Sequence, residues 1–413
     1  MPDHVIRRTC RICGGRDLDV ILDLGSTPLA NAFIAPERAA DPEPHYPLAA
    51  ALCLRCGQVQ LTVVVDPGTM FRNYLYASSA SAPSLPHFAD YAHEIADRFA
   101  PQGSLVVEIG SNDGVLLRPL VERGINVLGI EPATMIAANA NDSGLRTWNT
   151  FFSSEVARRA REAFGPAKAV RANNVLAHID DLGDVLVGLD VLLDTDGVFV
   201  AEVPYLGDLI EGAEYDTIYH EHLSYFALAP LETLFRSIGL ELFDVQHMPI
   251  HGGSVRLSVG RRGVHEKTAD LGRMLAAEGR ACLSDGATYR AFAARVRASR
   301  DALRRLIDRE RSAGMRVAGL GATAKGSTLL NYCGLGPSVI EYIGDSTELK
   351  QGLLTPGMRI PVVAEERLKT DRPDRILLLA WNYADAIVPR YRDYLNAGGR
   401  FIHPIPLARL IGG

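Results

Sequence analysis

Apolar positions along the middle of the chain fall into short runs separated by helical patterns. Between about residues 85 and 260, the runs SLVVEIG, NVLGIEP, AKAVRAN and GVFVAEVP alternate with stretches such as VLLRPLVERG and TMIAANAND, whose apolar residues recur at helical spacing. Strands that alternate with helices in this way are typical of a βαβ series with a parallel sheet. The pattern therefore predicts a doubly wound α/β unit here.

A second series of the same kind is predicted near the C-terminus. It begins after a long charged helical pattern that ends near residue 313 and places Phe292, Val296, Leu303 and Leu306/Ile307 at helical spacing. We expect this helix to join the two units and to pack one side on a core. Beyond it, MRVAGLGA, SVIEYIGDS and DRILLLAWN again read as strands of a βα series.

The first 75 or so residues differ from both units. They contain two CxxC pairs and a Pro-rich stretch, ERAADPEPHYPL, that is expected to form a loop. We therefore divide the chain into three predicted domains, residues 1–75, 76–262 and 263–413. The fold class is α/β.

Composition narrows the range of functions. The 413 residues carry a formal net charge of −6, which argues against a general nucleic-acid role. No apolar run approaches the roughly 20 residues that span a bilayer, and MPDHVIRRTC lacks the apolar core of a signal peptide. We expect a cytoplasmic protein without a membrane partner, and the sequence leaves its oligomeric state open.

The two CxxC pairs predict a metal site. Cys10, Cys13, Cys53 and Cys56 offer the four thiolates that a tetrahedral Zn²⁺ accepts, and four sulfurs leave no open coordination position, so the zinc is expected to be structural. A redox dithiol is the competing interpretation. The isolated Cys282 is expected to pack within a helix, as is the isolated Cys333.

A glycine-rich turn after the first strand of the middle unit predicts a cofactor site. In VVEIGSNDG a strand runs into a turn and then a helix, and a carboxylate closes the next strand in GIEP, where it can accept hydrogen bonds from a ribose diol. The turn lacks the GxGxxG of most dinucleotide sites and favours S-adenosylmethionine over a dinucleotide. The predicted cofactor contacts are Glu108, Gly110, Asn112, Asp113, Gly114, Glu131 and Asn173.

The stretch EYDTIYHEHLSYF sets two histidines around a carboxylate. A zinc site is the weakest interpretation, because HExxH places its histidines four positions apart. If the segment is extended, Tyr219 and Glu221 point to one side while His220 and His222 point to the other. Acid/base chemistry and a plain polar loop both remain open from the residues alone.

A second glycine-rich turn, GLGATAKG, follows a strand of the C-terminal unit. Its backbone NH groups, Thr323 and Lys325 could receive a diphosphate, whereas the alternative is a turn required only for packing. His251 and Arg256 could face a sugar or a phosphate, or could have structural functions only. Further predicted ligand contacts, at the end of a strand, are Asn382 and Tyr383.

Several of these motifs together resemble a known family. They are CRICGG, LDLGSTPLANAF, CLRCG, YLYASSAS, EIGSNDG, GIEP, YHEHLSYF, HGGSVR, GLGATAKGSTLLNY, IGDSTELKQGLLTPG and LAWNY. Over nearly its whole length the chain is similar to the S-adenosylmethionine-dependent sugar C-methyltransferases of antibiotic deoxysugar biosynthesis. It looks closest to those that methylate C-3 of a dTDP-linked 4-keto-6-deoxyhexose.

The resemblance implies an architecture and a chemistry. The architecture comprises an N-terminal zinc-binding domain, a central Rossmann-like methyltransferase domain and a C-terminal Rossmann-like domain that helps to hold the nucleotide sugar. The family's cleft residues map onto Tyr219, His222 and Tyr76, with Glu221 beside them and Ser79 in the YLYASSAS motif. Since C-methylation next to a ketone requires an enolate, a base must remove the C-3 proton, and a histidine suits that step at neutral pH. His222 is the predicted base, and Tyr219 or Tyr76 could hydrogen-bond the enolate oxygen or shuttle a proton.

Three other functions compete with this interpretation. A zinc-domain methyltransferase for RNA or protein would need a basic face near the cysteines, yet residues 14–52 contain several acids and few bases. A NAD-dependent sugar oxidoreductase could use the GLGATAKG turn. A scaffold without activity would have no need for Tyr219, His222 and the EIGSNDG turn together. The substituents of the sugar at C-2 and C-3, and the stereochemical outcome, are not encoded in any spacing.

Overall fold

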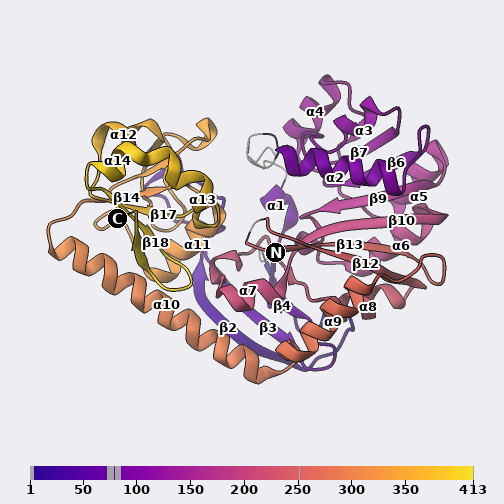
Figure 1. Ribbon diagram of the computed structural model, residues 1–413, viewed down its shortest axis with the longest axis horizontal. Helices are drawn as coiled ribbons and strands as arrows, with labels where there is room; N and C mark the ends of the chain where they lie inside the picture. Colours follow the sequence, from indigo (N-terminus) through magenta and orange to yellow (C-terminus); the bar gives the residue numbers. More distant parts are fainter. Residues whose placement is uncertain (1–3, 72–78, 80–84, 251, 413) are drawn as a thin grey trace.

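The computed structural model describes residues 4–71, 79, 85–250 and 252–412. The chain forms two lobes that are joined at their base (Figure 1). One lobe holds the middle stretch of the chain, the other holds its C-terminal stretch, and the N-terminal sheet and the long helix α10 (Gly286–Ser312) lie at the base between them. None of the described helices is both long enough and apolar enough to cross a membrane.

The N-terminal part is mostly β structure. Its strands and short helices are β1 (His4–Ile6), β2 (Leu18–Thr27), η1 (Pro36–Arg38), β3 (Tyr46–Cys53), β4 (Val59–Leu61), β5 (Val63–Val65) and α1 (Pro67–Phe71). One sheet has the strand order β11-β4-β3-β2, and its strand β11 (Ser224–Tyr225) comes from the middle of the chain. The YHEHLSYF segment therefore contributes its last residues to the N-terminal sheet.

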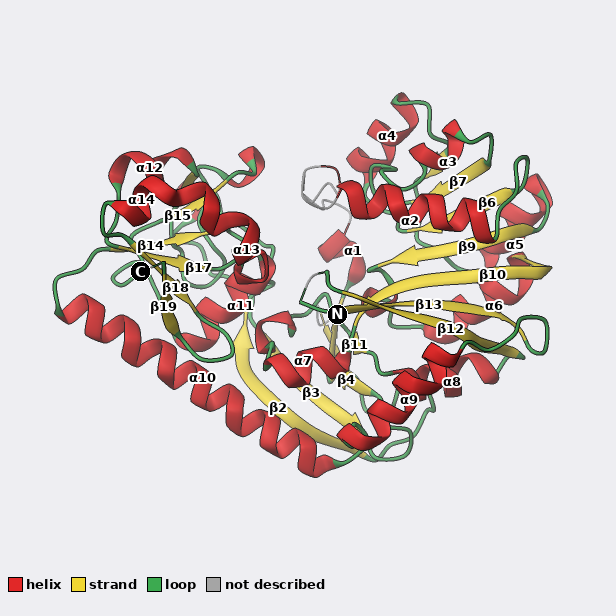
Figure 2. Cartoon of the chain, viewed as in Figure 1, coloured by secondary structure: helices red, strands yellow, loops and turns green. Residues whose placement is uncertain are grey.

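The middle lobe is built on a seven-stranded sheet with the order β12-β13-β10-β9-β6-β7-β8 (Figure 2). The strands are β6 (Leu105–Ile109), β7 (Asn126–Ile130), β8 (Thr147–Trp148), β9 (Ala167–Asn173), β10 (Leu193–Pro204), β12 (Leu240–Met248) and β13 (Ser254–Arg261). The predicted parallel series is confirmed for β6 to β10. The last two strands along the chain, β12 and β13, pair antiparallel, because the connecting residues 249–253 are too few for a helical crossover.

Helices cover both faces of this sheet. The helices of this stretch are α2 (Leu85–Arg98), α3 (Arg118–Glu122), α4 (Thr134–Asp142), α5 (Ser154–Phe164), η4 (Leu176–His178), α6 (Leu182–Leu192), α7 (Leu206–Gly212), η5 (Tyr215–Thr217), α8 (Leu228–Arg236) and α9 (Ala269–Ala281). Of these, α7 and η5 pack in the buried cluster at the base and not on this sheet. Residues of α2, α3 and α4 form one buried cluster with the sheet, and residues of α5, α6 and α8 form another. Each face therefore has its own core.

The C-terminal lobe is a second, six-stranded α/β sheet with the order β16-β15-β14-β17-β18-β19. Its elements are β14 (Val317–Leu320), α11 (Ala324–Cys333), β15 (Ile343–Asp345), η6 (Glu348–Lys350), β16 (Val362–Ala364), α12 (Glu366–Asp371), β17 (Arg375–Leu378), η7 (Trp381–Tyr383), α13 (Ala384–Ile387), η8 (Val388–Tyr391), α14 (Arg392–Asn396), β18 (Arg400–His403) and β19 (Arg409–Ile411). The second βα series is thus confirmed, with β19 antiparallel at the edge.

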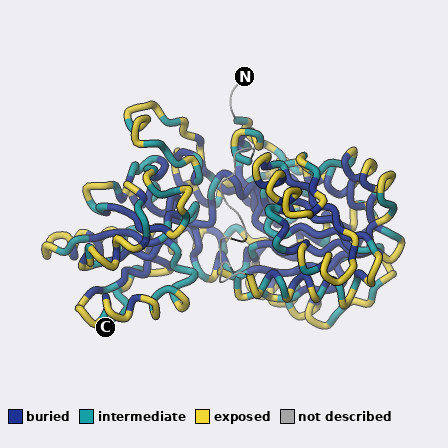
Figure 3. The backbone as a smooth tube through the Cα atoms, turned by 90° about the horizontal axis from the view of Figure 1, so that it is seen from above, coloured by how far each residue is buried: buried dark blue, intermediate teal, exposed yellow. Residues whose placement is uncertain are grey.

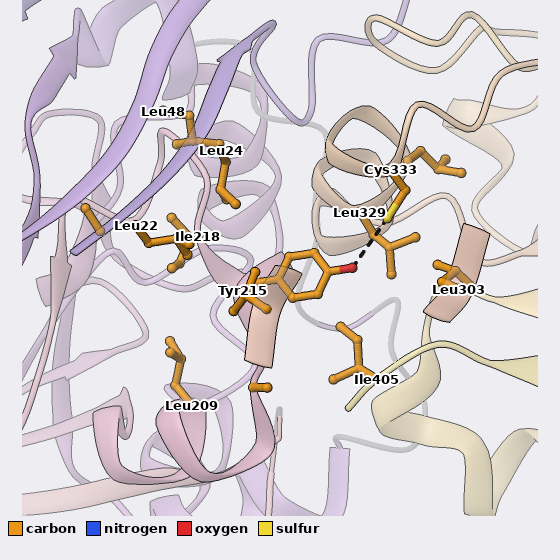
Figure 4. Close-up of a cluster of buried hydrophobic side chains, with 14 of the residues drawn as sticks. Leu22, Leu24, Leu48, Leu209, Tyr215, Ile218, Leu303, Leu329, Cys333 and Ile405 are labelled. Carbon is orange, nitrogen blue, oxygen red and sulfur yellow. Dashed lines mark hydrogen bonds between the residues drawn. The ribbon is translucent and has the colours of Figure 1, made fainter. Parts of the chain in front are cut away.

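A single buried cluster connects the lobes at their base. It combines strands β2 and β3, the segment 206–227, helix α10 and the C-terminal sheet. Tyr215 lies in its middle, where its hydroxyl is 3.5 Å from Cys333 Sγ (Figure 4). Buried positions continue through the junction as well as inside each lobe (Figure 3). The N-terminal part and the C-terminal lobe therefore share one core.

Helix α10 confirms the amphipathic pattern seen in the sequence. All five of its predicted core residues are buried: Phe292, Val296, Leu303, Leu306 and Ile307. The cysteine expectation is half correct. Cys333 is buried in α11, but Cys282 is exposed in the left-handed conformation that ends α9. The helix stops one residue before Cys282, so its side chain has no helix face to pack against.

Candidate active site

The four N-terminal cysteines converge on one point. Cys10 Sγ lies 3.5 Å from Cys56 Sγ, Cys13 Sγ lies 3.6 Å from Cys53 Sγ, and all four sulfurs lie within 4.8 Å of one another. Tetrahedral zinc bonds of about 2.3 Å separate two sulfurs by about 3.8 Å, so this donor set fits one Zn²⁺.

Arg11 lies between Cys10 and Cys13 and connects this cysteine cluster to the end of the YHEH segment. Its side chain is fully buried, and Nη1 donates hydrogen bonds to the carbonyl oxygens of Leu61 and Leu223 at 2.8 and 3.0 Å. Leu223 follows His222 directly. Sequence reasoning missed Arg11, because an arginine inside a CxxC pair carries no signal of a distant partner.

The EIGSNDG turn is tightly wound at the C-terminal edge of the middle sheet. Asn112 has a left-handed backbone, with φ of 50°, and its NH donates to Glu131 Oε2 at 2.9 Å. Gly110 has φ of 64°, and a Cβ at this position would collide with Val175. Asp113 accepts a hydrogen bond from the backbone NH of Ser79 at 3.2 Å. The predicted cofactor residues therefore meet in one place, and Ser79 lies beside them.

Several polar atoms at this edge are buried without a hydrogen-bond partner among the described residues. They are Glu108 Oε2, Ser111 Oγ, Asp113 Oδ1, Asn173 Oδ1 and Asn174 Oδ1. One of these residues, Asp113, also lines an open hollow of about 560 Å³, together with Ser79 and Ile136. Because buried polar groups are normally hydrogen-bonded, this edge has the chemistry of a site for a polar ligand.

The YHEH segment is a turn, and the extended alternation expected from the sequence is wrong. The backbone NH of His222 bonds to the carbonyl of Tyr219 at 2.9 Å, which closes a turn over four residues. As a result Tyr219 and His222 lie on the same side, with the Tyr219 hydroxyl 2.9 Å from His222 Nε2. The side chains that alternation would separate are in direct contact.

The hydrogen bonds of His222 define its tautomer. Nδ1 lies 2.9 Å from the carbonyl oxygen of Thr217, and a carbonyl can only accept, so Nδ1 carries the proton. In the neutral ring Nε2 is then the acceptor for the Tyr219 hydroxyl. This tautomer sets a basic nitrogen beside a phenol, an arrangement suited to proton abstraction.

Glu221 and His178 fix the outer side of this turn. Glu221 Oε1 accepts a hydrogen bond from Asn31 Nδ2 at 2.7 Å, while the backbone carbonyl of Glu221 accepts one from His178 Nδ1 at 2.7 Å. The His178 ring meets the His222 ring edge-on, with centroids 5.1 Å apart. Burial lowers the pKa of His178 to about 4, so this ring is neutral near pH 7. Asn31 and His178 were missed because their partner is more than 40 residues away.

Lys350 reaches the same region from the C-terminal lobe. Its Nζ donates to the carbonyl oxygen of Ala322 at 2.8 Å and lies 5.3 Å from the centre of the Phe33 ring. Burial lowers the pKa of Lys350, and the charges of Asp345 and Glu221 oppose that shift. Residues of all three parts of the chain thus surround Glu221. Lys350 belongs to a motif read in the sequence but was not assigned a function.

The second glycine-rich turn faces the same junction. Thr323 caps helix α11 by accepting a hydrogen bond from Gly326 NH at 2.9 Å, and Lys325 Nζ lies 3.4 Å from Glu214 Oε2 and 5.3 Å from the Trp381 ring. Burial raises the pKa of Glu214 to about 7, against the opposing charge of Lys325. Asn382 and Tyr383 follow Trp381 in η7. The predicted diphosphate residues therefore gather at one sheet edge.

Arg256 lies elsewhere, beneath helix α2. Its guanidinium bonds to Glu202 Oε2 at 2.9 Å and to Glu94 Oε2 at 2.6 Å, and the side chain is almost fully buried. These two carboxylates already neutralise it in the described structure, and its predicted contact with a sugar or phosphate stays a prediction. The predicted residues Tyr76 and His251 lie outside the described residues.

The families and the relative that this chain matches cover nearly its whole length. Residues 10–71 match a family described as "Putative zinc binding domain", residues 86–245 match a methyltransferase domain, and residues 249–406 match a C-methyltransferase C-terminal domain. The C-methyltransferase NovU of Streptomyces niveus is 40% identical over 97% of this chain and 96% of its own length. The chain belongs to the S-adenosylmethionine-dependent C-methyltransferases.

Solved methyltransferase structures are more distant from this C-methyltransferase. Magnesium protoporphyrin IX methyltransferase of Synechocystis PCC 6803 with bound SAM is 13% identical, with 43% of this chain and 78% of that chain covered and a TM-score of 0.32. For the cyclopropane synthase MmaA2 of Mycobacterium tuberculosis the identity is 12%, the coverage 43% and 84%, and the TM-score 0.34.

The cofactors of this C-methyltransferase are S-adenosylmethionine and a structural zinc ion. Both fit the residues present. The buried, unpartnered oxygens at the edge of the middle sheet suit a ligand that carries ammonium and hydroxyl donors. The four sulfurs fill a tetrahedral shell and leave no position for a substrate. Methyl transfer and zinc binding are therefore separate functions in the molecule.

Proposed function

We propose that this enzyme methylates C-3 of a dTDP-linked 4-keto-deoxyhexose through an enolate. The observation that carries the proposal is the Tyr219–His222 pair, in which the carbonyl of Thr217 fixes the proton on Nδ1 and leaves Nε2 basic. A C-methyltransferase needs a carbon nucleophile, and a ketone next to the acceptor carbon supplies one once a base removes a proton. The name of the relative NovU agrees with a C-methyl transfer.

In this mechanism His222 Nε2 takes the proton from C-3, and the electron pair of that C–H bond moves into the enolate. The Tyr219 hydroxyl turns from Nε2 to the enolate oxygen or relays the proton, and Tyr76 is proposed to reach the same substrate. Bound S-adenosylmethionine supplies the methyl group that the enolate carbon takes. Asn31 and His178 keep the loop in place by holding Glu221 at its side chain and its carbonyl.

The remaining predicted residues are assigned to the two ligands. Glu108, Glu131, Asn173 and the turn from Gly110 to Gly114 are proposed to hold S-adenosylmethionine. The sugar nucleotide is proposed to lie between the lobes, with its diphosphate near Thr323 and Lys325. A phosphate there would compete with Glu214 for the Lys325 ammonium, which now lies 3.4 Å from that carboxylate. Ser79, Asn382, Tyr383, His251 and Arg256 complete the proposed sugar-nucleotide contacts.

The test records two quantities in one incubation, the methyl gain of the sugar and the exchange of its C-3 proton. The enzyme is mixed with S-adenosylmethionine and a dTDP-linked 4-keto-2,6-dideoxyhexose in D₂O, and mass spectrometry records methyl gain while NMR records exchange at C-3. We expect one added methyl on carbon and exchange that is lost in His222→Asn. His45→Asn, which changes an exposed histidine, is the matched control and should behave as the wild type.

Two results would contradict parts of the proposal. If neither methyl gain nor exchange appears over a panel that includes 3-amino and 3-hydroxy sugars, the proposed acceptor is wrong. If exchange survives in His222→Asn and disappears in Tyr219→Phe or Tyr76→Phe, the base is a tyrosine.

A further inference from the structure

A charged side chain that the proposed mechanism does not use lies inside the middle lobe. Arg171, on strand β9, has no exposed surface, and the centre of its guanidinium lies 4.2 Å from the ring centre of Tyr91 on helix α2. Its Nε is 3.7 Å from Glu108 Oε1. None of its three side-chain nitrogens has a hydrogen-bond partner within the described ranges, and neither has Glu108 Oε2.

The sheet itself places these two side chains together. Glu108 on β6 and Arg171 on β9 are directly paired in the parallel register, so both side chains point to the face that α2 covers. Glu108 is the second residue before Gly110, where the cofactor turn begins. The guanidinium is therefore held next to the one carboxylate of β6 that borders the proposed cofactor site.

The Arg171–Glu108 pair is not expected to stabilise the fold. A buried ion pair stabilises a fold little or not at all unless additional hydrogen bonds satisfy its remaining atoms. Arg256, two strands away on β13 and also against the Tyr91 ring, has that support from Glu202 and Glu94. Among the described residues, Glu108 is the only carboxylate that pairs with Arg171, and it lies at a distance longer than a normal hydrogen bond.

The other charges around Glu108 are unfavourable to its ionisation. Asp113 on the turn and Glu131 at the end of β7 both repel negative charge there, and burial adds to this effect. From α2, Tyr91 contributes a neutral ring, while Glu94 and His87 are directed to Arg256 and Glu202. Burial raises the pKa of Glu108 to about 7, and Arg171 acts against that rise.

We propose that Arg171 is a positioning residue that keeps Glu108 ionised, so that Glu108 accepts a hydrogen bond from the α-ammonium group of S-adenosylmethionine. This inference rests on the proposed placement of the cofactor at the EIGSNDG turn. The ligand class is an α-amino acid attached to adenosine, since a carboxylate at this point favours ligands that carry a positively charged ammonium group. Arg171 itself contacts neither the methyl group nor the acceptor.

The experiment measures the affinity for S-adenosylmethionine against pH, from about pH 6 to pH 9, by calorimetry. Wild-type affinity should rise with pH through about 7, because Glu108 becomes charged there. In Arg171→Met the midpoint should move up by one unit or more, since an opposite charge nearby shifts a carboxyl pKa by about 1–3 units. The Kd at pH 7 should then increase about fivefold or more, as fewer molecules carry the carboxylate.

Two controls separate the contribution of the Glu108 charge: the variant Glu108→Gln and the ligand 5′-methylthioadenosine. The glutamine variant should bind S-adenosylmethionine weakly and without the pH midpoint, and adding Arg171→Met to it should cause no further pH-dependent change. 5′-Methylthioadenosine lacks the amino-acid group, so its affinity should be independent of pH in every variant. Arg171→Lys keeps the charge and should retain the wild-type midpoint.

Several outcomes would overturn the inference. One is an Arg171→Met profile with the wild-type midpoint, and another is an equal loss of affinity for 5′-methylthioadenosine. If Arg171→Met does not fold, as judged by circular dichroism, Arg171→Lys carries the test, and a midpoint one unit higher in that variant would refute the proposal. Absence of any S-adenosylmethionine binding by the wild type would instead contradict the proposed cofactor site.

Discussion

Tyr219 and His222 meet because the main chain turns between them. The hydrogen bond from His222 NH to the Tyr219 carbonyl closes the turn, and Thr217 then selects the imidazole tautomer. The Tyr219 hydroxyl lies 2.9 Å from His222 Nε2, so Tyr219 is a direct residue for testing the mechanism.

We expect Tyr219→Phe to lower kcat about 10- to 100-fold. The reason is that the variant removes a hydrogen bond to a group that becomes charged, worth about 1.5–3 kcal/mol, while Nδ1 of His222 stays bonded to Thr217. Steady-state kinetics at saturating cofactor would measure this. Tyr289→Phe, which removes a buried hydroxyl bonded to the Leu283 carbonyl and not to His222, is the control and should keep the wild-type rate. Equal rates in both variants would remove Tyr219 from the reaction.

The sequence singled out the residues of the YHEH segment but not their arrangement. The residue types of YHEH already suggested acid/base chemistry, but the side on which each points depends on a turn that Gly or Pro does not mark. Asn31 and His178 could not be found from spacing, because each contacts Glu221 only after distant segments have packed. A prediction from local pattern lacks that information.

Helix α10 is the element that connects the two lobes along the base (Figure 1). Its buried side carries residues from Tyr289 to Ile307 in the shared core, and its arginines other than Arg300 are exposed. The periodic pattern predicted this helix because its apolar face follows from its own sequence. By contrast, the antiparallel β12–β13 pair and the addition of β11 to the N-terminal sheet arise from pairing between segments, which periodicity does not report.

Leu303→Ala in α10 should reduce the free energy of unfolding by about 2–5 kcal/mol, because Leu303 is fully buried and its loss leaves a cavity. Urea unfolding followed by circular dichroism would measure it. Arg305→Ala, on the exposed side of the same helix, should change that free energy by no more than about 0.5 kcal/mol. A loss below 1 kcal/mol for Leu303→Ala would contradict the shared core.

On the scale of the whole molecule, the four-cysteine site is connected to the loop that carries the proposed base. Arg11 stands between two zinc ligands and donates to the carbonyl of Leu223, next to His222. The zinc site thus takes no part in the chemistry, since the metal has no open position for a substrate, but it is linked through Arg11 to the loop that carries the proposed base.

Removal of zinc with a chelator should therefore abolish methyl transfer while S-adenosylmethionine still binds. The reason is that the middle lobe has two cores of its own, whereas the loop from Tyr219 to Leu223 depends on the N-terminal sheet. Calorimetry and a transfer assay on the same sample would separate the two functions, and zinc added back should restore transfer. Full transfer by protein shown to be zinc-free would disprove the connection.

The shared core also has a consequence for the order in which the chain can fold during synthesis. The middle lobe is complete once about residue 275 has left the ribosome, but strands β2 and β3 must wait for partners as late as Ile405. For most of translation the first-made strands therefore lack their final apolar contacts, although domains generally fold from the N-terminus onward. Limited proteolysis of stalled nascent chains would show protection of the middle lobe before that of the N-terminal sheet, a reversal of the order of synthesis.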